Sequence, residues 1–253
     1  MVAVSAGVFA QSAAFDVATI KLTPPDFRGR YIRMEGAEFV ARNHELRRLI
    51  AAAWNLPPRA VSGGPGWVDS DRYDILAKPP GQARPNTDEQ MAMLRDLVTD
   101  RFHLTFHREP KDFSIYVLTV AKGGSKLKES AAPAGGQPEI VNVVYPEKDG
   151  GFILRLPARN ATMAQFVSML QRGMFDRPVV DKTGLSGRYD FDLEWSPDET
   201  QFEGQLARPP DAGPPTKPSF FEAVQQQAGL RLEAARGPIQ TIVIDKVERP
   251  AEN

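Results

Sequence analysis

Apolar and polar residues alternate over residues 15–22 (Phe-Asp-Val-Ala-Thr-Ile-Lys-Leu), a pattern that predicts a strand. A second strand is expected at residues 31–40. Apolar residues then recur at helical spacing from Leu46 to Trp54, and Asn43 stands where a helix N-cap is expected. The chain therefore begins with two strands that lead into an amphipathic helix.

The remainder of the first half predicts three further elements. A strand is expected at residues 72–78, and Thr87 with Gln90 forms a capping-box pattern before a helix whose apolar face ends at Phe102. Residues 104–108 and 113–120 then have the pattern of a hairpin.

The second half repeats this order of elements. The expected elements are a strand at 152–156, a helix capped by Asn160, a strand at 188–195, a helix capped by Ser219, and a hairpin of residues 230–234 and 239–247. Ala41-Arg42-Asn43 and Arg72-Tyr73-Asp74 reappear as Ala158-Arg159-Asn160 and Arg188-Tyr189-Asp190, at nearly the same separation. We therefore predict an α+β fold of two tandem duplicated subdomains, each αββαββ with a mostly antiparallel sheet faced by two helices.

This duplication sets the predicted domain boundaries. They are a signal-peptide remnant or disordered tail (1–14), a first repeat (15–122), a Gly/Ala/Pro-rich joint (123–150) and a second repeat (151–253) that contains a Pro-rich insertion (200–218). The insertion is expected to form a mobile surface loop. The leading strand at 15–22 and the closing strand at 239–247 are expected to pair across the copies.

Composition and charge narrow the function classes. The 253 residues carry 31 Lys plus Arg against 32 Asp plus Glu, a formal net charge of −1, so no basic excess is available to hold nucleic acid. The chain has no cysteine, which excludes disulfides, thiolate metal sites and cysteine nucleophiles. No segment approaches the roughly 20 apolar residues of a membrane-spanning helix.

The N-terminus favours export. Residues 2–10 are short, apolar and rich in small side chains, with Val8 and Ala10 placed as the −3 and −1 residues of a cleavage site. The positive n-region and the longer apolar stretch of a full signal peptide are missing. We interpret the segment as a signal-peptide remnant from a truncated or misassigned start and expect a periplasmic or extracellular protein.

Several longer phrases resemble a known family. They are Phe-Asp-Val-Ala-Thr-Ile-Lys (15–21), Ser-Gly-Gly-Pro-Gly-Trp (62–67), Asp-Arg-Phe-His-Leu (100–104), Val-Asp-Lys-Thr-Gly-Leu-Ser-Gly-Arg-Tyr-Asp (180–190) and Val-Ile-Asp-Lys-Val-Glu-Arg-Pro (243–250). The chain is similar over nearly its whole length to exported, largely uncharacterised proteins abundant in soil Acidobacteria of the Solibacter type. The resemblance implies export and a soil bacterium, and relatives attached to membrane metallopeptidase sensors imply a sensing or binding role. It supplies no catalytic residues.

Catalytic motifs are incomplete. Ser125-x-x-Lys128 and Lys182-Thr183-Gly184 match serine β-lactamase signatures, but Ser125 follows a Gly-Gly turn with no apolar helix behind it. His103 and His107 are four residues apart on a predicted strand and would share one face, which makes them candidate catalytic bases. Zinc would need a third nearby ligand, so the alternative is a pair of polar residues on a solvated face.

Carboxylates form the denser cluster. The candidate metal ligands are Asp69, Asp71 and Asp74 in the first copy and Asp190, Asp192 and Glu194 in the second. Oxygen ligands at this density suit Ca²⁺, the one possible cofactor. Arg72 and Arg188 are natural ion-pair partners, and the recurrence of Arg-Tyr-Asp favours a structural role with the tyrosine in the core.

Two functional hypotheses follow. The first is binding of a small molecule or an envelope protein in a cleft between the copies, with Trp54, Trp67, Trp195, Arg72 and Arg188 as candidate binding residues. The favoured explanation of the tryptophans, however, is that they are core or interface aromatics. The second hypothesis is a calcium-assisted hydrolase of small esters or lactones, such as acylated homoserine lactones, with a histidine as the base.

Overall fold

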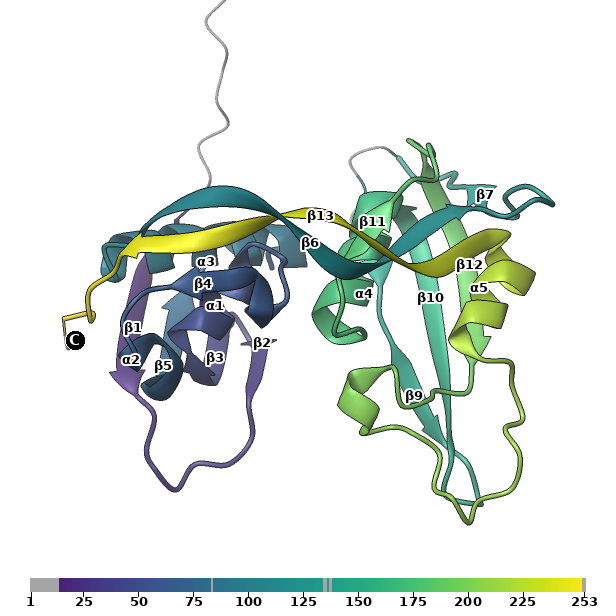
Figure 1. The fold of residues 1–253 in the computed structure, drawn as a ribbon, viewed down its shortest axis with the longest axis horizontal. Helices are drawn as coiled ribbons and strands as arrows, with labels where there is room; N and C mark the ends of the chain where they lie inside the picture. Colours follow the sequence, from purple (N-terminus) through teal and green to yellow (C-terminus); the bar gives the residue numbers. More distant parts are fainter. Residues whose placement is uncertain (1–13, 83, 134–135, 137, 252–253) are drawn as a thin grey trace, which may run out of the picture. The chain divides into compact units, whose positions relative to one another are not determined.

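The computed structural model describes residues 14–82, 84–133, 136 and 138–251, and the expected signal-peptide remnant lies outside this part apart from Ala14. The fold is mixed α and β (Figure 1). Unit 1 comprises residues 1–54, 58–108 and 242–253, and unit 2 comprises residues 55–57 and 109–241. In the described part of the chain, no helix is long and apolar enough to cross a membrane.

Unit 1 is built on an antiparallel sheet with the strand order β1-β5-β3-β2. Its strands are β1 (Val17–Leu22), β2 (Tyr31–Glu35), β3 (Glu38–Glu45), β4 (Val61–Gly63) and β5 (Arg72–Lys78), and its helices are α1 (Leu46–Ala53), α2 (Trp67–Ser70) and α3 (Thr87–Arg101), with a 3-10 turn at Pro58–Ala60. The strands expected at 15–22 and 72–78 are therefore confirmed. The strand expected at 31–40 is a hairpin instead, because Gly36, with φ of 59°, turns the chain between β2 and β3.

The helices of unit 1 bury one face each. Leu46, Leu49 and Ile50 of α1 have no exposed surface, and they recur at the spacing of one helix face. Leu94 and Val98 present the corresponding face of α3, and the two helices are in contact. The capping box of α3 is formed by Asn86 and Glu89, one residue before the predicted pair.

Unit 2 has a second antiparallel sheet with the order β7-β12-β10-β8, in which β9 also pairs with β10. Its elements are β7 (Lys128–Glu129), β8 (Glu139–Ile140), β9 (Val143–Pro146), β10 (Phe152–Thr162), α4 (Met163–Gly173), β11 (Val179–Asp181), β12 (Arg188–Trp195) and α5 (Phe220–Ala228), with a 3-10 turn at Phe202–Gly204. Three of these strands fall in residues 123–150, where a Gly/Ala/Pro-rich joint was expected. Phe166, Trp195 and Phe220, each without exposed surface, belong to the core behind this sheet.

The two predicted hairpins are wrong. Residues 105–120 form one continuous strand, β6 (Thr105–Val120), and residues 230–246 form another, β13 (Leu230–Lys246). The two strands are neighbours in a third sheet of order β11-β6-β13-β4, and Figure 1 shows them side by side. Pairing between the two strands provides the hydrogen bonds that two separate hairpins would have provided, so Pro110 and Pro238 do not turn the chain.

Both units use part of each long strand. Residues 105–108 of β6 and 242–246 of β13 belong to unit 1, and the remainder of each strand belongs to unit 2. In unit 1, β4 pairs with β13 in parallel, and in unit 2, β11 pairs with β6 in parallel. The expected pairing of the leading and closing strands is wrong, since β1 pairs with β5 and the neighbours of β13 are β6 and β4.

The helix caps predicted at Asn43 and Asn160 are also wrong. Both residues lie inside strands, with left-handed φ values of 61° and 51°, at the points where β3 and β10 bulge. Helix α1 begins after Glu45, and α4 begins after Thr162, which forms a capping box with Gln165. Asparagine favours both helix caps and left-handed bulges, so the residue type alone did not separate them.

The two bulges are held by equivalent hydrogen bonds. The backbone N–H of Asn43 donates to Asp74 at 3.0 Å, and that of Asn160 donates to Asp190 at 2.8 Å. The side-chain amides of the two asparagines donate to the carbonyls of Gly29 and Gly136, both at 2.7 Å. The recurring Ala-Arg-Asn and Arg-Tyr-Asp triplets therefore build the same local structure in each unit.

Arg208 ties the Pro-rich insertion to the loop between β9 and β10. Its guanidinium donates to Glu147 at 2.7 Å and also pairs with Asp149, and only 14% of the side chain is exposed. The Pro-rich insertion, which was expected to be a mobile surface loop, is therefore anchored at Arg208 by a partly buried ion-pair network.

Candidate functional site

The carboxylates that were predicted to bind metal are engaged by cations or by backbone groups. In unit 1 the ion pairs are Arg47–Asp69 at 2.5 Å, Arg249–Asp71 at 2.8 Å and Arg42–Asp74 at 2.7 Å. Burial disfavours the charge on Asp74, but hydrogen bonds from Asn43, Thr23 and Arg42 outweigh it and hold the pKa of Asp74 below its ordinary value. Asp74 therefore holds the first bulge, while Asp69 and Asp71 pair with arginines elsewhere in unit 1.

The carboxylates of β12 are arranged in the same way. Arg159 donates to both oxygens of Asp192 at 2.9 and 3.0 Å, and Arg155 donates to Glu194 at 3.1 Å. Hydrogen bonds from the backbone of Asn160 and from Ser130 lower the pKa of Asp190. Among the described residues, no group of three His, Asp or Glu side chains is arranged to hold a metal ion. Calcium binding by these carboxylates therefore stays a prediction.

The two candidate histidines do not share one strand face. His103 precedes β6 in the turn after α3, with a left-handed φ of 47°, so its predicted place on the strand is wrong. His107 lies on β6, and its Nδ1 is 2.7 Å from a carboxylate oxygen of Asp245 on β13. This pairing of imidazole and carboxylate orients the ring.

The three tryptophans occupy different environments. Trp195 is fully buried and donates from Nε1 to Gln201 at 2.9 Å, so it is a core residue of unit 2. Trp54 packs edge-on against Phe106, with ring centres 5.1 Å apart. Trp67 begins α2 and lies under the guanidinium of Arg249 at 5.0 Å.

Arg72 and Arg188 bind different partners. Arg188 donates to the backbone carbonyl of Asn160 at 2.9 Å. Arg72 lies 3.4 Å from Glu45 and is about half exposed. The tyrosines that follow them are 2% and 7% exposed, which confirms the predicted core role of the tyrosine in Arg-Tyr-Asp.

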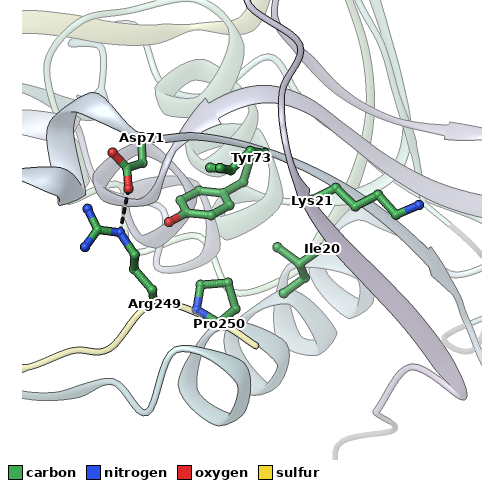
Figure 2. Close-up of a pocket in the computed structure, with 7 residues that line it drawn as sticks. Ile20, Lys21, Asp71, Tyr73, Arg249 and Pro250 are labelled. Carbon is green, nitrogen blue, oxygen red and sulfur yellow. Dashed lines mark hydrogen bonds and ion pairs between the residues drawn. The ribbon is translucent and has the colours of Figure 1, made fainter. Parts of the chain in front are cut away.

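A hollow in unit 1 brings several of these residues together. It has a volume of about 90 Å³ and is lined by Ile20, Lys21, Leu22, Asp71, Tyr73, Arg249 and Pro250 (Figure 2). Strand β1 and the start of β5 supply one wall, because Leu22 pairs with Tyr73 across the sheet. The C-terminal segment after β13 supplies Arg249 and Pro250.

The polar end of the hollow contains an unpaired hydroxyl. Tyr73 packs edge-on against Phe102, and its buried Oη makes no hydrogen bond of normal geometry to a described residue, although the Arg249 guanidinium lies near it. Burial raises the pKa of Tyr73, and the charge of Asp71 raises it further, while the nearby Arg249 guanidinium opposes the shift. The hydroxyl is therefore protonated at neutral pH and can donate to an acceptor.

In this region the sequence had given Trp67 and Asp71 as candidate site residues, whereas Ile20, Arg249 and Pro250 occurred only within the longer phrases that resemble a known family. An alternating strand and a Pro-containing C-terminal segment give no local sign that they meet. The recurrence of the Arg-Tyr-Asp triplet in both halves was the one sequence feature that indicated a buried ring at Tyr73.

Comparison with known proteins identifies one family. Residues 47–247 match the family described as "Protein of unknown function (DUF3738)". No curated protein and no solved structure matches the chain. The match confirms the expected resemblance to an uncharacterised family.

Proposed function

We propose that this chain, which belongs to the DUF3738 family of proteins of unknown function, is a ligand-binding protein whose site is the hollow of unit 1. The observation that carries the proposal is the Tyr73 hydroxyl, which lies on the wall of the hollow without a hydrogen-bond partner in the described residues. A buried hydroxyl without a partner destabilises the free protein, so a ligand that supplies an acceptor would gain binding free energy from this hydrogen bond.

The shape and lining of the hollow suit a small amphipathic molecule. Ile20, Leu22 and Pro250 provide apolar surface, and Leu22 is 60% exposed, which is high for a large apolar side chain. About 90 Å³ holds only a few non-hydrogen atoms, so the bound part is a short chain or a small ring.

The mouth of the hollow can open by side-chain movement alone. Arg249 is 60% exposed and pairs at 2.8 Å with Asp71, which is 23% exposed. Figure 2 shows this ion pair beside the hydroxyl end of Tyr73. An exposed ion pair of this kind holds its side chains weakly. Rotation of Arg249 would uncover Oη for a neutral acceptor, such as an ester, lactone or amide carbonyl.

The experiment is a binding titration with short esters and acylated lactones, followed by calorimetry on the whole chain. Because Oη makes no hydrogen bond of normal geometry to a described residue, Tyr73→Phe should leave the melting temperature of the free protein nearly unchanged. The same variant should weaken ligand binding about tenfold, since the ligand loses its donor.

Tyr189→Phe is the matched control, because Tyr189 follows the corresponding arginine in unit 2. It should bind like the wild type. Equal affinity in wild type and Tyr73→Phe, or no saturable binding by any compound in the panel, would overturn the proposed site.

The alternative function is hydrolysis of the same esters or lactones, and one observation favours it. Asp245 holds Nδ1 of His107 at 2.7 Å, the orientation that a general base requires. Release of acid from the panel, lost in His107→Gln and unaffected in Tyr73→Phe, would establish this activity in place of simple binding.

We also propose that the two units arose by duplication of one unit. The shared bulge, its hydrogen bonds to Asp74 and Asp190, and the repeated order of strand, helix, short parallel strand, strand and helix support this. An experimental structure in which residues 38–78 do not superpose on residues 152–195 would contradict the proposal.

A further inference from the structure

We infer that Arg30, Arg48 and Arg72 of unit 1 form a second binding site, which takes the phosphate or carboxylate group of a small anion. This inference is independent of the hollow beside Tyr73.

The three arginines converge on one carboxylate. Guanidinium nitrogens of Arg30, Arg48 and Arg72 lie 3.9, 3.3 and 3.4 Å from Glu45, whose side chain is only 13% exposed. Three positive charges therefore surround one negative charge. The local excess of positive charge contrasts with the formal net charge of −1 for the whole chain.

Glu45 does not use the donors that the arginines offer. Each guanidinium carries five N–H donors, and a carboxylate can accept about four hydrogen bonds in total. The Oε2 atom of Glu45 is buried and makes no hydrogen bond to any described residue. Within the described part of the chain, the side-chain hydrogen bond of Arg72 is a long one of 3.4 Å to Asn43. Most guanidinium donors of the cluster are therefore not used by described residues.

The arginine side chains are also accessible. They are 35%, 38% and 54% exposed, whereas the carboxylate between them is largely covered. An anion arriving from solvent would meet the guanidinium groups first. Planar guanidinium groups bind phosphate and carboxylate oxygens in pairs, which is the chemistry we assign to the site.

Unit 2 shows that the fold does not need this cluster. Counting from the shared Ala-Arg-Asn triplet, Thr162 stands at the position of Glu45 and Gln165 at the position of Arg48. Thr162 and Gln165 cap α4 with reciprocal hydrogen bonds, while Glu45 makes no side-chain cap at α1. Helix α1 of unit 1 thus lacks a side-chain cap at Glu45, the residue that the three arginines surround.

The site is separate from the hollow, although Arg72 and Tyr73 are neighbours. Successive side chains of β5 point to opposite faces of the sheet. Arg72 is exposed on one face, and Tyr73 is 2% exposed on the other. A variant at Arg72 or Arg48 therefore leaves the lining of the hollow in place.

The experiment is calorimetric titration of the whole chain with inorganic phosphate and, in a second arm, with acetate at low ionic strength. Phosphate binding alone identifies a phosphate site, and binding of both identifies a general oxyanion site. Arg48→Gln places the residue of unit 2 at this position and should weaken binding about tenfold, the usual effect of losing one charge-assisted hydrogen bond. Glu45→Gln removes the competing carboxylate and should strengthen binding.

Arg155→Gln is the matched control, because Arg155 is an exposed arginine of unit 2 paired with Glu194. It should bind anions as the wild type does. Circular dichroism spectra that match the wild type would show that each variant is folded. The inference is overturned if neither anion binds saturably, or if Arg48→Gln and Arg155→Gln bind with equal affinity.

Discussion

His44 gives unit 1 a defined weakness in acid. The side chain is 8% exposed, and neither ring nitrogen has a hydrogen-bond partner with normal geometry in the described residues. The pKa of His44 is lowered from 6.5 to about 4, chiefly by burial and in smaller part by the charges of Arg30 and Arg48, while the backbone of Tyr31 and the charge of Glu45 oppose the shift. The folded protein therefore keeps this imidazole neutral in conditions where the unfolded chain protonates it.

The sign of the effect follows from this difference. Below pH 6.5 the unfolded state binds a proton at His44 that the folded state does not bind until about pH 4. The contribution of neutral His44 to the unfolding free energy is therefore fully present above pH 6.5 and is lost as the pH falls towards 4. Each unit of pKa difference corresponds to about 1.4 kcal/mol, so between pH 7 and pH 4 the loss is about 3 kcal/mol.

The perturbation is His44→Leu, which replaces the ring by an apolar side chain that cannot titrate. At pH 7 we expect little loss of stability, because two buried unpaired nitrogens are removed with the ring. Between pH 7 and pH 4 the difference in unfolding free energy between wild type and variant should shift by about 3 kcal/mol in favour of the variant. Carboxylates titrate in the same range, but their contribution is common to both proteins and cancels.

The assay is urea unfolding at pH 7, 6, 5 and 4, followed by tryptophan fluorescence in a Trp195→Phe background. Trp54 and Trp67 then report on unit 1 alone. His103→Asn, which removes an exposed histidine at a left-handed position that asparagine accepts, is the control and should keep the wild-type pH dependence. If the unfolding free energies of wild type and His44→Leu fall in parallel between pH 7 and pH 4, the reasoning is refuted.

Three further predictions concern the fold. Asn160→Ala should lower the unfolding free energy by about 2 kcal/mol, because alanine disfavours a left-handed φ and loses the hydrogen bond to Gly136. In denaturant titrations Asn160→Gly should recover part of this loss. Equal losses in the alanine and glycine variants would argue against backbone strain as a cause. Gly63→Ala should cost about 2 kcal/mol or more, because a Cβ atom would lie 2.6 Å from the carbonyl oxygen of Ile244 on the paired strand. Gly66→Ala, where no atom lies within 4 Å, should change the melting temperature little, and similar melting temperatures for both variants would contradict this view of the β4–β13 contact. Ser219→Ala should cost about 1 kcal/mol by removing the capping box with Glu222, and thermal unfolding unchanged from the wild type would show that α5 does not depend on its cap.

Elements that depend on local pattern were predictable. The strands predicted at residues 15–22 and 72–78 correspond to β1 and β5, and Ser219 marked the start of α5, because caps and periodicity are set by neighbouring residues. The burial of Tyr73 and Tyr189 was predictable for a similar reason, since a repeated triplet identifies positions under the same constraint. The α and β composition of the fold therefore followed from the sequence.

Choices that depend on distant partners were not predictable. Residues 105–120 carry the pattern of a hairpin, and only pairing with residues more than a hundred positions away makes them one strand. The roles of the predicted metal carboxylates were decided in the same way, because Arg249 reaches Asp71 from the far end of the chain.

The hollow beside Tyr73 and the arginine cluster at Glu45 complete this contrast. The sequence by itself determined where apolar faces, turns and charges occur along the chain, since these follow from each residue and its neighbours. Only the tertiary structure decided that Ile20, Tyr73 and Arg249 share one hollow and that three arginines meet at one carboxylate. The physical reason is that hydrogen bonding and burial are satisfied by whichever partner the folded chain brings near, and that partner is not written in the local pattern.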